Sequence, residues 1–422
     1  MTRQRKLSIA IISLVLLCAM AVNLTGCVMP VQAKSLMEGV TPNTVSVLTD
    51  ISDSNAAMTD FALRIFKAAN ENGKSTLISP LSIIYALAMT ANGADGETLR
   101  QMEEVLGMSI DELNLYLYSY MHTLPQGNKY KLSLANSIWF KEDERFKVVE
   151  EFLQKNADYY GADIYSSDFS GQTLKDINNW VKRETDGMIP KVLDEIPEEA
   201  IMYLINALAF EAEWQEIYEH AQVRDGVFTK EDGSTDDVEL MYCTEHQYLE
   251  DENATGFIKY YSGRKYAFAA LLPNEGVSVS DYLASLDGNA LYEMLSNAEG
   301  AIVRTAIPKF ELEYSTMLSS VLENMGMTDA FDVYMADFSG IGSYDEAAGG
   351  NIYISEVIHK THIQVGEKGT KAGAVTVVEL KGMTSEGPTE IKEVYLDRPF
   401  VYMLIDCENN IPFFIGTMMS AE

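Results

Sequence analysis

The sequence has little cysteine and little histidine, and no motif that would make either residue a metal ligand. Only four of its 422 residues are cysteine and five are histidine. It contains no Cys-x-x-Cys pair, no His-Glu-x-x-His motif and no cluster of the two types, so a metal site is not indicated. Cys18 and Cys27 lie near the N-terminus, which leaves Cys243 and Cys407. These two allow one disulfide but no disulfide framework.

The sequence also lacks the motifs of an enzyme. A hydrolase needs a nucleophile beside an orienting base, and the Gly-x-Ser-x-Gly motif that often carries the nucleophile is absent. The five histidines fall in no catalytic pattern. The glycine-containing segment 340–345 lacks the strand-and-helix context of a phosphate-binding loop. Neither catalytic residues nor a cofactor are therefore expected.

Basic residues are scarce compared with acidic ones. The chain has 31 Lys and Arg against 63 Asp and Glu, which gives a formal net charge of -32. Such a chain repels nucleic acids and anionic membrane surfaces, so we expect no nucleic-acid partner. The charge would attract basic proteins, or it would only keep an exported protein soluble. Composition does not choose between these two interpretations.

The longest hydrophobic run lies at the N-terminus. It extends from Leu7 to Val22 and follows the basic start MTRQRK, which is typical of an export signal. It ends in Leu24-Thr25-Gly26-Cys27, which resembles a bacterial lipobox. We therefore predict a lipoprotein signal peptide at 1–26 and a lipid on Cys27. A short membrane anchor or an ordinary signal peptide are the alternatives, although the run is short for a membrane span.

Removal of the predicted signal changes the charge of the chain. Residues 1–26 contain three basic residues and no acidic one, so the mature chain would carry -32 - 3 = -35.

Residues 27–55 contain Pro30, Gly39 and Pro42 and show no periodicity, which predicts a flexible tether. No linker-like gap interrupts residues 56–422, so we predict one large domain there, although length alone favours more.

Hydrophobic periodicity places helices mainly early and strands mainly late in the chain. Helical spacing is found at 57–70, in an almost wholly apolar segment at 81–94 that follows Ser79-Pro80, and at 174–185 before Asp186-Gly187. Strand signals occur at Leu132–Phe140, Met202–Trp214, Val238–Tyr248, Thr255–Tyr261, Tyr266–Leu272, Ala301–Glu313, Tyr353–Gly366 and Pro399–Ile405. This order predicts an α+β fold.

The segment Gly366–Glu390 joins a strand pattern to a loop pattern. Alternate residues on one face are small or uncharged, namely Thr370, Ala372, Ala374, Thr376, Val378 and Leu380. The other face carries every charge of the strand and consists of Lys371, Gly373, Val375, Val377, Glu379 and Lys381. Such alternation is typical of a strand with one buried face. Gly382, Gly387 and Pro388 follow among polar residues, as in a loop. An ordinary hairpin strand before a long loop is the alternative.

Several motifs in a fixed order resemble the serpin family. They are Ser79–Ile83 (SPLSI), Leu134–Trp139 (LANSIW), Asn206-Ala207, Ile307–Phe310 (IPKF), Met325–Phe331 (MGMTDAF), Phe338–Ile341 (FSGI), Tyr353–Ala374, Asp397–Tyr402 and Phe413–Gly416. The resemblance covers residues 56–422. It implies a serpin fold with three β-sheets, about nine helices and an exposed reactive-centre loop at about 367–396.

The resemblance also implies a function as a suicide-substrate inhibitor of serine proteases, and not as an enzyme. The protease would cleave the exposed loop, and the freed strand would insert into the main sheet before the acyl-enzyme is hydrolysed. Two alternatives remain, which are a non-inhibitory serpin that acts as a protease substrate or binding protein, and a lipid-anchored ligand-binding protein. The implied partner is a serine protease of elastase-, chymotrypsin- or subtilisin-like type.

Family spacing from Gly369 and Thr370 places the reactive bond at Met383-Thr384. Cleavage after Leu380 or Lys381 is the alternative. The resemblance implies a loop hinge formed by Glu367, Gly369, Thr370, Lys371, Ala372, Gly373, Ala374, Val375 and Thr376. Lys371 and Gly373 depart from the more usual Glu and Ala, but both fall on the outward face. A lysine is tolerable there, and a glycine costs about 0.5–1 kcal/mol of strand stability.

Further positions match structural parts of the family. Ser79, Ser82, Asn206 and His359 match a polar cluster beneath the centre of the main sheet, where its strands part. Trp214, Lys309 and Glu367 match the top of that sheet, with an ion pair implied between the last two. We expect a monomer without a metal or other cofactor, anchored through the lipid on Cys27. Its expected location is the cell surface or another extracytoplasmic site, or the extracellular space after shedding.

Overall fold

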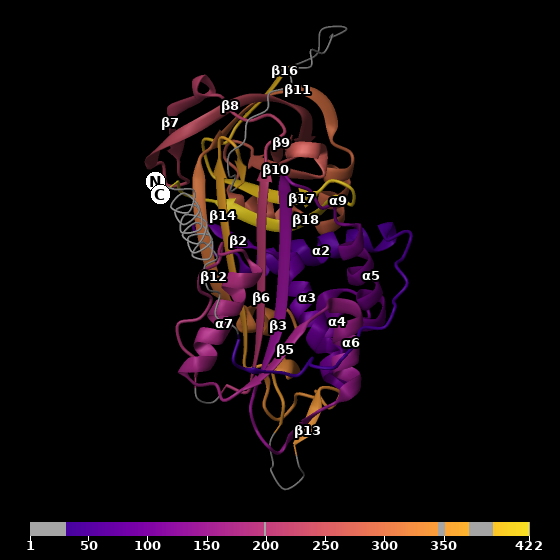
Figure 1. Ribbon diagram of the computed structural model, residues 1–422. Helices are drawn as coiled ribbons and strands as arrows, with labels where there is room; N and C mark the ends of the chain where they lie inside the picture. Colours follow the sequence, from indigo (N-terminus) through magenta and orange to yellow (C-terminus); the bar gives the residue numbers. More distant parts are fainter. Residues whose placement is uncertain (1–30, 198–199, 345–350, 371–390, 422) are drawn as a thin grey trace, which may run out of the picture.

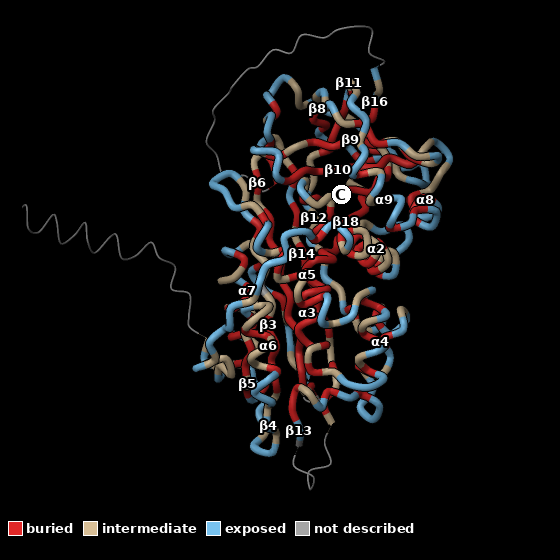
Figure 2. The backbone as a smooth tube through the Cα atoms, turned by 90° about the vertical axis from the view of Figure 1, so that its right-hand side faces the viewer, coloured by how far each residue is buried: buried red, intermediate tan, exposed pale blue. Residues whose placement is uncertain are grey.

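The computed structural model describes residues 31–197, 200–344, 351–370 and 391–421 (Figure 1). Nine α-helices and three β-sheets make up this part of the chain. The molecule is elongated, and the long strands of one sheet run along its length with most helices behind them. Buried residues concentrate where the helices meet the sheets (Figure 2). The predicted α+β class and the expected three sheets and nine helices are confirmed.

A seven-stranded sheet forms the face of the molecule toward the viewer in Figure 1. Its strands, in spatial order, are β1 (Lys34–Ser35), β5 (Asp163–Ser167), β3 (Tyr130–Lys141), β6 (Met202–Glu213), β15 (Gly369–Thr370), β14 (Glu356–Gly366) and β12 (Phe310–Met317). The central strands β3 and β6 pair antiparallel over most of their length. Both neighbours of the short β15 are long strands, so β15 lies inside the sheet.

The second large sheet has nine strands. Eight follow one another in the order β16 (Ile391–Tyr395), β11 (Glu299–Pro308), β8 (Thr235–Glu250), β9 (Ala254–Tyr260), β10 (Tyr266–Pro273), β17 (Phe400–Asp406), β18 (Ile411–Met418) and β2 (Thr76–Ile78). The ninth, β7 (Val223–Thr229), pairs with β8. A third sheet joins β13 (Gly342–Tyr344) to β4 (Phe146–Val148). The strands β10, β17 and β18 are wholly buried and form the centre of the core.

The helices follow from local sequence signals. They are α2 (Ser52–Ala69), α3 (Pro80–Ala91), α4 (Gly96–Leu106), α5 (Ile110–Thr123), α6 (Glu150–Tyr160), α7 (Gly171–Glu184), α8 (Val279–Ser285), α9 (Gly288–Ser296) and α10 (Ser319–Asn324). Ser79 caps α3 by accepting a hydrogen bond from the Ser82 amide, and Pro80 occupies the first turn. Every residue of α3 is buried, as its apolar sequence predicts.

One predicted strand is wrong in its extent. The segment Ala301–Glu313 was expected to be a single strand, but it divides at Lys309 into β11 and β12, which belong to different sheets. The amide of Lys309 donates to Glu239 O on β8, at the point where the chain leaves one sheet for the other. Strand-forming residues are found on both sides of the break, so the strand signal alone did not reveal it.

The predicted flexible tether is wrong for residues 31–51, which pack against the body. The strand β1 pairs antiparallel with β5 at the edge of the seven-stranded sheet. The amides of Gln32 and Ala33 each donate to Asp176 Oδ2 at 2.9 Å. The amide of Leu48 donates to Ser119 Oγ at 2.9 Å. Although this segment shows no hydrophobic periodicity, its backbone amides donate hydrogen bonds to side chains of the body. The predicted signal peptide and Cys27 lie outside the described residues.

In the described part of the chain, the two remaining cysteines form no disulfide, and the His, Cys, Asp and Glu residues form no metal-binding cluster. Cys243 and Cys407 are free thiols, so the disulfide that the sequence allowed is not formed. No group of three or more potential metal ligands comes together among the described residues. Within the same ranges, each helix is too short or too polar to span a bilayer.

Candidate functional site

The first hinge residues form a strand inside the seven-stranded sheet. Thr370 pairs with Ala212 of β6 on one side and with Val365 of β14 on the other. Gly369 pairs in the same antiparallel manner on both sides. The start of the predicted loop therefore already occupies a position between two long strands of the main sheet.

Both residues of β15 suit this interior position. Thr370 is 2% exposed, and its Oγ1 lies 2.5 Å from the hydroxyl of Tyr261. Gly369 has φ +147°, and a Cβ atom built on it would lie 2.0 Å from Ala212 O. Only glycine tolerates that approach. The strand β15 therefore consists of one residue that must be glycine and one whose side chain is small, polar and hydrogen-bonded.

Below β15 the two neighbouring strands close directly on each other. The parallel pairing of β6 with β14 extends from Tyr203 opposite Glu356 to Ala207 opposite Lys360. Among the described residues, β6 and β14 do not pair with each other beyond Ala207 and Lys360. Farther up the sheet, β15 lies between them and pairs with both. The sheet thus has a wedge-shaped opening whose upper end is filled by Gly369 and Thr370. A further strand entering it would run antiparallel to both walls, as β15 does.

The predicted polar cluster lies at the narrow end of this wedge. Asn206 and His359 are opposite each other in the β6–β14 pairing, one residue before it ends. His359 Nδ1 lies 2.8 Å from Asn206 Oδ1, and the Ser79 amide donates to His359 Nε2 at 3.0 Å. Ser82 Oγ donates to the same Asn206 oxygen at 3.1 Å. The four predicted residues are therefore brought together, and all four are fully buried.

The hydrogen bonds fix the state of His359. Because Nε2 accepts a hydrogen bond from the Ser79 amide, Nδ1 carries the ring proton and donates a hydrogen bond to Asn206 Oδ1. Burial lowers the pKa of His359 to about 3, so the ring is neutral at physiological pH. The cluster thus links the first turn of α3, at its cap Ser79 and at Ser82, to both walls of the wedge. All of its groups are uncharged.

The predicted residues at the top of the sheet also meet. Trp214 Nε1 donates to Gly366 O at 2.8 Å, and the Trp214 amide donates to Lys368 O at 2.9 Å. Lys309 Nζ lies 2.9 Å from Glu367 Oε1 and 2.8 Å from Glu239 Oε2. The hydrogen bond from Lys309 lowers the pKa of Glu367. These contacts hold the chain immediately before the hinge.

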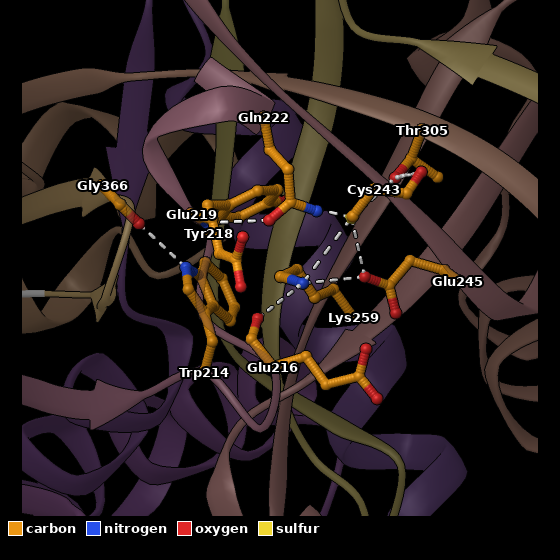
Figure 3. A network of polar contacts seen from close by, with 10 residues as sticks. All are labelled: Trp214, Glu216, Tyr218, Glu219, Gln222, Cys243, Glu245, Lys259, Thr305 and Gly366. Atoms are coloured by element: carbon orange, nitrogen blue, oxygen red, sulfur yellow. Dashed lines mark hydrogen bonds and ion pairs between the residues drawn. The ribbon is translucent and has the colours of Figure 1, made fainter. Parts of the chain in front are cut away.

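A buried lysine behind Trp214 was not predicted (Figure 3). Lys259 of β9 is 2% exposed, and its Nζ lies 2.8 Å from Glu245 Oε1 of β8. The same ammonium lies 4.5 Å from the ring centre of Tyr218 and 5.3 Å from that of Trp214. Although burial opposes it, the carboxylate of Glu245 raises the pKa of Lys259. A single lysine in an alternating strand carries no signal that would reveal this.

This cluster connects the top of the sheet to the hinge. The amide of Tyr218 donates to Glu367 O at 2.9 Å, and Tyr261 stacks on Trp214 with ring centres 4.3 Å apart. Tyr261 in turn contacts Thr370. A cation, three aromatic rings and the hinge therefore form one continuous set of contacts.

The remaining predicted site residues lie outside the described residues. They are Lys371, Ala372, Gly373, Ala374, Val375 and Thr376 of the hinge, together with Leu380, Lys381, Met383 and Thr384 around the predicted reactive bond. The described chain stops at Thr370 in the seven-stranded sheet and resumes at Ile391, where β16 pairs parallel with β11 of the nine-stranded sheet. The predicted loop therefore joins two different sheets.

Comparisons with known proteins give one family. The family profile described as "Serpin (serine protease inhibitor)" matches residues 56–421. An uncharacterized serpin-like protein of Thermococcus kodakarensis is 31% identical, over 87% of this chain and 85% of that protein. The leukocyte elastase inhibitor of Equus caballus is 29% identical, over 87% of this chain and 99% of that protein.

Solved structures agree with this result. The thermophilic serpin tengpin in its native state is 48% identical, with a TM-score of 0.87 over 92% of this chain and all of that one. Tengpin in its latent state gives a lower TM-score of 0.77, over 90% of this chain. The motifs, the fold and the wedge in the main sheet thus agree with the family match, and the chain belongs to the serpin family.

Proposed function

We propose that this protein is a suicide-substrate inhibitor of serine proteases. The protease serine would attack the carbonyl carbon of Met383, and the amide nitrogen of Thr384 would leave as an amine after taking up a proton. An ester between the protease serine and Met383 then remains. Insertion of the freed strand into the main sheet would displace the protease before water hydrolyses that ester.

The observation that carries the proposal is the half-filled wedge between β6 and β14. Gly369 and Thr370 already pair with both walls, and the walls meet directly only at Lys360 and below. Continuation of β15 would extend two existing ladders and, farther down, would take the place of the direct β6–β14 pairs. Each hydrogen bond formed beyond those broken contributes roughly 1 kcal/mol net. The alternation from Thr370 to Leu380 would place small, uncharged side chains on the buried face.

The target class follows from the residue at the proposed bond. Met383 is unbranched and apolar, which suits elastase-, chymotrypsin- or subtilisin-like pockets. One relative at 29% identity is named a leukocyte elastase inhibitor, which supports an elastase-like target. We further propose that the protein acts as a monomer, exported and held at a membrane through a lipid on Cys27. The excess of acidic residues would speed association with basic proteases.

The proposal is tested by mixing the purified protein with elastase-, chymotrypsin-, trypsin- and subtilisin-like enzymes. We expect a covalent complex that survives a denaturing gel for at least one of the apolar-specific enzymes. Mass spectrometry of the released peptide should place the cut after Met383. Cleavage without any complex would favour a non-inhibitory serpin, and no cleavage within 371–390 would contradict the loop assignment.

A second experiment tests strand insertion separately. After cleavage by a protease that does not form a complex, the two fragments should remain associated and unfold at a higher temperature than the intact chain. The added strand provides the extra stability, because it completes both ladders of the wedge. Equal melting temperatures for cleaved and intact protein would show that no insertion takes place.

A further inference from the structure

A cavity of about 410 Å³ lies at the edge of the main sheet, away from the wedge. Its lining residues come from α3, α5, α6 and α7, from β3 and β5, and from the N-terminal segment at Pro42 and Asn43. This volume lies within the range of small-molecule sites in proteins. The cavity does not belong to the hinge, the polar cluster or the Lys259 network.

Aromatic side chains dominate its walls. Five of them line it, namely Tyr85, Tyr118, Tyr159, Tyr160 and Trp180. Neighbouring tyrosine rings meet edge to face, with interplanar angles of 89° for Tyr118 with Tyr159 and 90° for Tyr85 with Tyr160. In each pair the edge of one ring is directed at the face of the other, and the Tyr118 ring also lies against the His122 ring, with ring centres 4.1 Å apart. The negative faces of such rings attract cations.

The tyrosine hydroxyls at the base of the cavity are already satisfied. Tyr85 donates to Leu117 O, and Tyr160 donates to Asn114 Oδ1, each at 2.5 Å. Both partners belong to α5 and do not line the cavity. These two hydroxyls are therefore already engaged, and a ligand would contact the aromatic rings.

The charged groups at the cavity are mostly acidic. Three carboxylates line it, those of Asp158, Asp163 and Glu184. Arg183 lies beside the last two, 2.7 Å from Glu184 and 3.9 Å from Asp163. Asp158 has no such counter-charge in the described contacts and accepts hydrogen bonds only from the neutral Asn43 and Gln154. The lining residues include one histidine, His122, and no lysine or arginine.

We infer that this cavity binds a small organic cation, recognised by the tyrosine and tryptophan faces and by the carboxylate of Asp158. The matching ligand class is a quaternary ammonium or protonated alkylamine with an apolar body. A neutral molecule of the same shape would gain the apolar contact but neither the cation–π nor the carboxylate attraction. This inference does not depend on the proposed inhibitory function.

Acetylcholine and its neutral carbon isostere 3,3-dimethylbutyl acetate form a matched pair of probes. We would titrate each into the purified protein at pH 8 and low ionic strength, and follow binding by calorimetry. Acetylcholine should bind with 1:1 stoichiometry, and the neutral ester about tenfold more weakly or not at all. Absence of saturable acetylcholine binding, or equal affinity for both probes, would overturn the inference.

Two variants locate the site and one serves as a control. Asp158→Asn keeps the shape but removes the charge, and Tyr118→Leu keeps an apolar side chain but removes the ring face. Each should weaken acetylcholine binding about three- to tenfold and leave the neutral ester unaffected. Tyr334→Leu, which changes a tyrosine that is 88% exposed and does not line the cavity, should bind as the unmodified protein does. Unchanged affinity in Asp158→Asn would overturn the assignment, even if Tyr118→Leu failed to fold.

Discussion

The hydroxyl of Tyr261 lies 2.5 Å from Oγ1 of Thr370, inside the sheet and out of contact with solvent. Tyr261 also stacks on Trp214, whose indole N–H binds Gly366 O. One aromatic pair therefore holds the end of β14 and the buried hinge residue Thr370 together. The inserted part of the hinge is fixed by side chains as well as by the strand ladders.

Replacing Tyr261 by Phe should lower the stability of the intact protein by about 1 kcal/mol, because the buried Thr370 hydroxyl loses its partner. Thr370→Val should have a similar effect. The double variant should cost less than the sum of the two, since both remove the same hydrogen bond. Urea unfolding of the four proteins measures this coupling. Strict additivity would show that the hydrogen bond contributes nothing.

Thr370→Arg should abolish the covalent protease complex while leaving cleavage of the loop intact. The side chain of residue 370 is buried, and an arginine there would bring an unpaired charge into the sheet. The hinge would then be excluded, and the protease would have time to hydrolyse the ester. Thr370→Ser is the matched control and should still form the complex on a denaturing gel. A complex of normal yield with Thr370→Arg would contradict the insertion path.

Much of the fold could be predicted from the sequence, because its signals are local. The buried helix α3 follows from its cap and apolar residues. Most strands follow from their residue pattern with small shifts at the ends, as for β6 and β10, which each differ from the prediction by one residue at the C-terminal end. The meeting of Asn206 with His359 came from the family resemblance, since 153 residues separate them and no local pattern connects them.

What could not be predicted depends on contacts between distant segments. Lys259 resembles any polar residue of an alternating strand until Glu245 and two aromatic rings are placed around it. The segment 31–51 has no periodicity, so its packing depends on acceptors such as Asp176 that lie elsewhere in the sequence. The break at Lys309 depends on tertiary pairing, because β11 pairs within the nine-stranded sheet and β12 within the seven-stranded sheet.

His359→Gln should make stability less dependent on pH between pH 7 and pH 5. In the folded protein burial lowers the pKa of His359 to about 3, whereas an unfolded histidine has a pKa near 6.5. In this window the unfolded state therefore binds the proton and the folded state does not, so the unmodified protein loses stability as pH falls. The expected loss from this residue is roughly 2 kcal/mol between pH 7 and pH 5.

Glutamine can still accept from the Ser79 amide and donate to Asn206, so the cluster should survive the His359→Gln change. Urea unfolding at several pH values measures the difference between variant and unmodified protein. His220→Gln, at an exposed position, is the control and should keep the original pH dependence. Parallel curves for His359→Gln and the unmodified protein would show that His359 is not the titrating group.

Lys259→Met should destabilise the protein by about 3 kcal/mol, because it leaves the carboxylate of Glu245 without its counter-charge in a largely buried position. The double variant with Glu245→Gln removes both charges and should recover most of that loss. Lys265→Met provides the control, since that lysine is exposed and lies 3.8 Å from the exposed Glu408. If the double variant were as unstable as Lys259→Met, lost packing and not the unpaired charge would explain the effect.

Asp176→Ala should release the N-terminal segment from the body. Asp176 is 2% exposed and accepts hydrogen bonds from the Gln32 and Ala33 amides, so its removal leaves two amides without an acceptor. The loss of the two bonds is expected to cost about 2 kcal/mol. The segment is otherwise held by the short β1–β5 pairing and by a few hydrogen bonds, such as those from Leu48 to Ser119 and from Asn43 to Asp158. It should therefore open far more often than the core.

Limited proteolysis measures this opening. Cleavage within residues 31–51 should be faster in Asp176→Ala than in the unmodified protein, while cleavage elsewhere keeps its rate. Asp225→Ala changes an exposed carboxylate on β7 and should leave both rates unchanged. If Asp176→Ala accelerated cleavage throughout the chain, the substitution would act on global stability, and the segment would be an integral part of the fold instead of an arm docked at its edge.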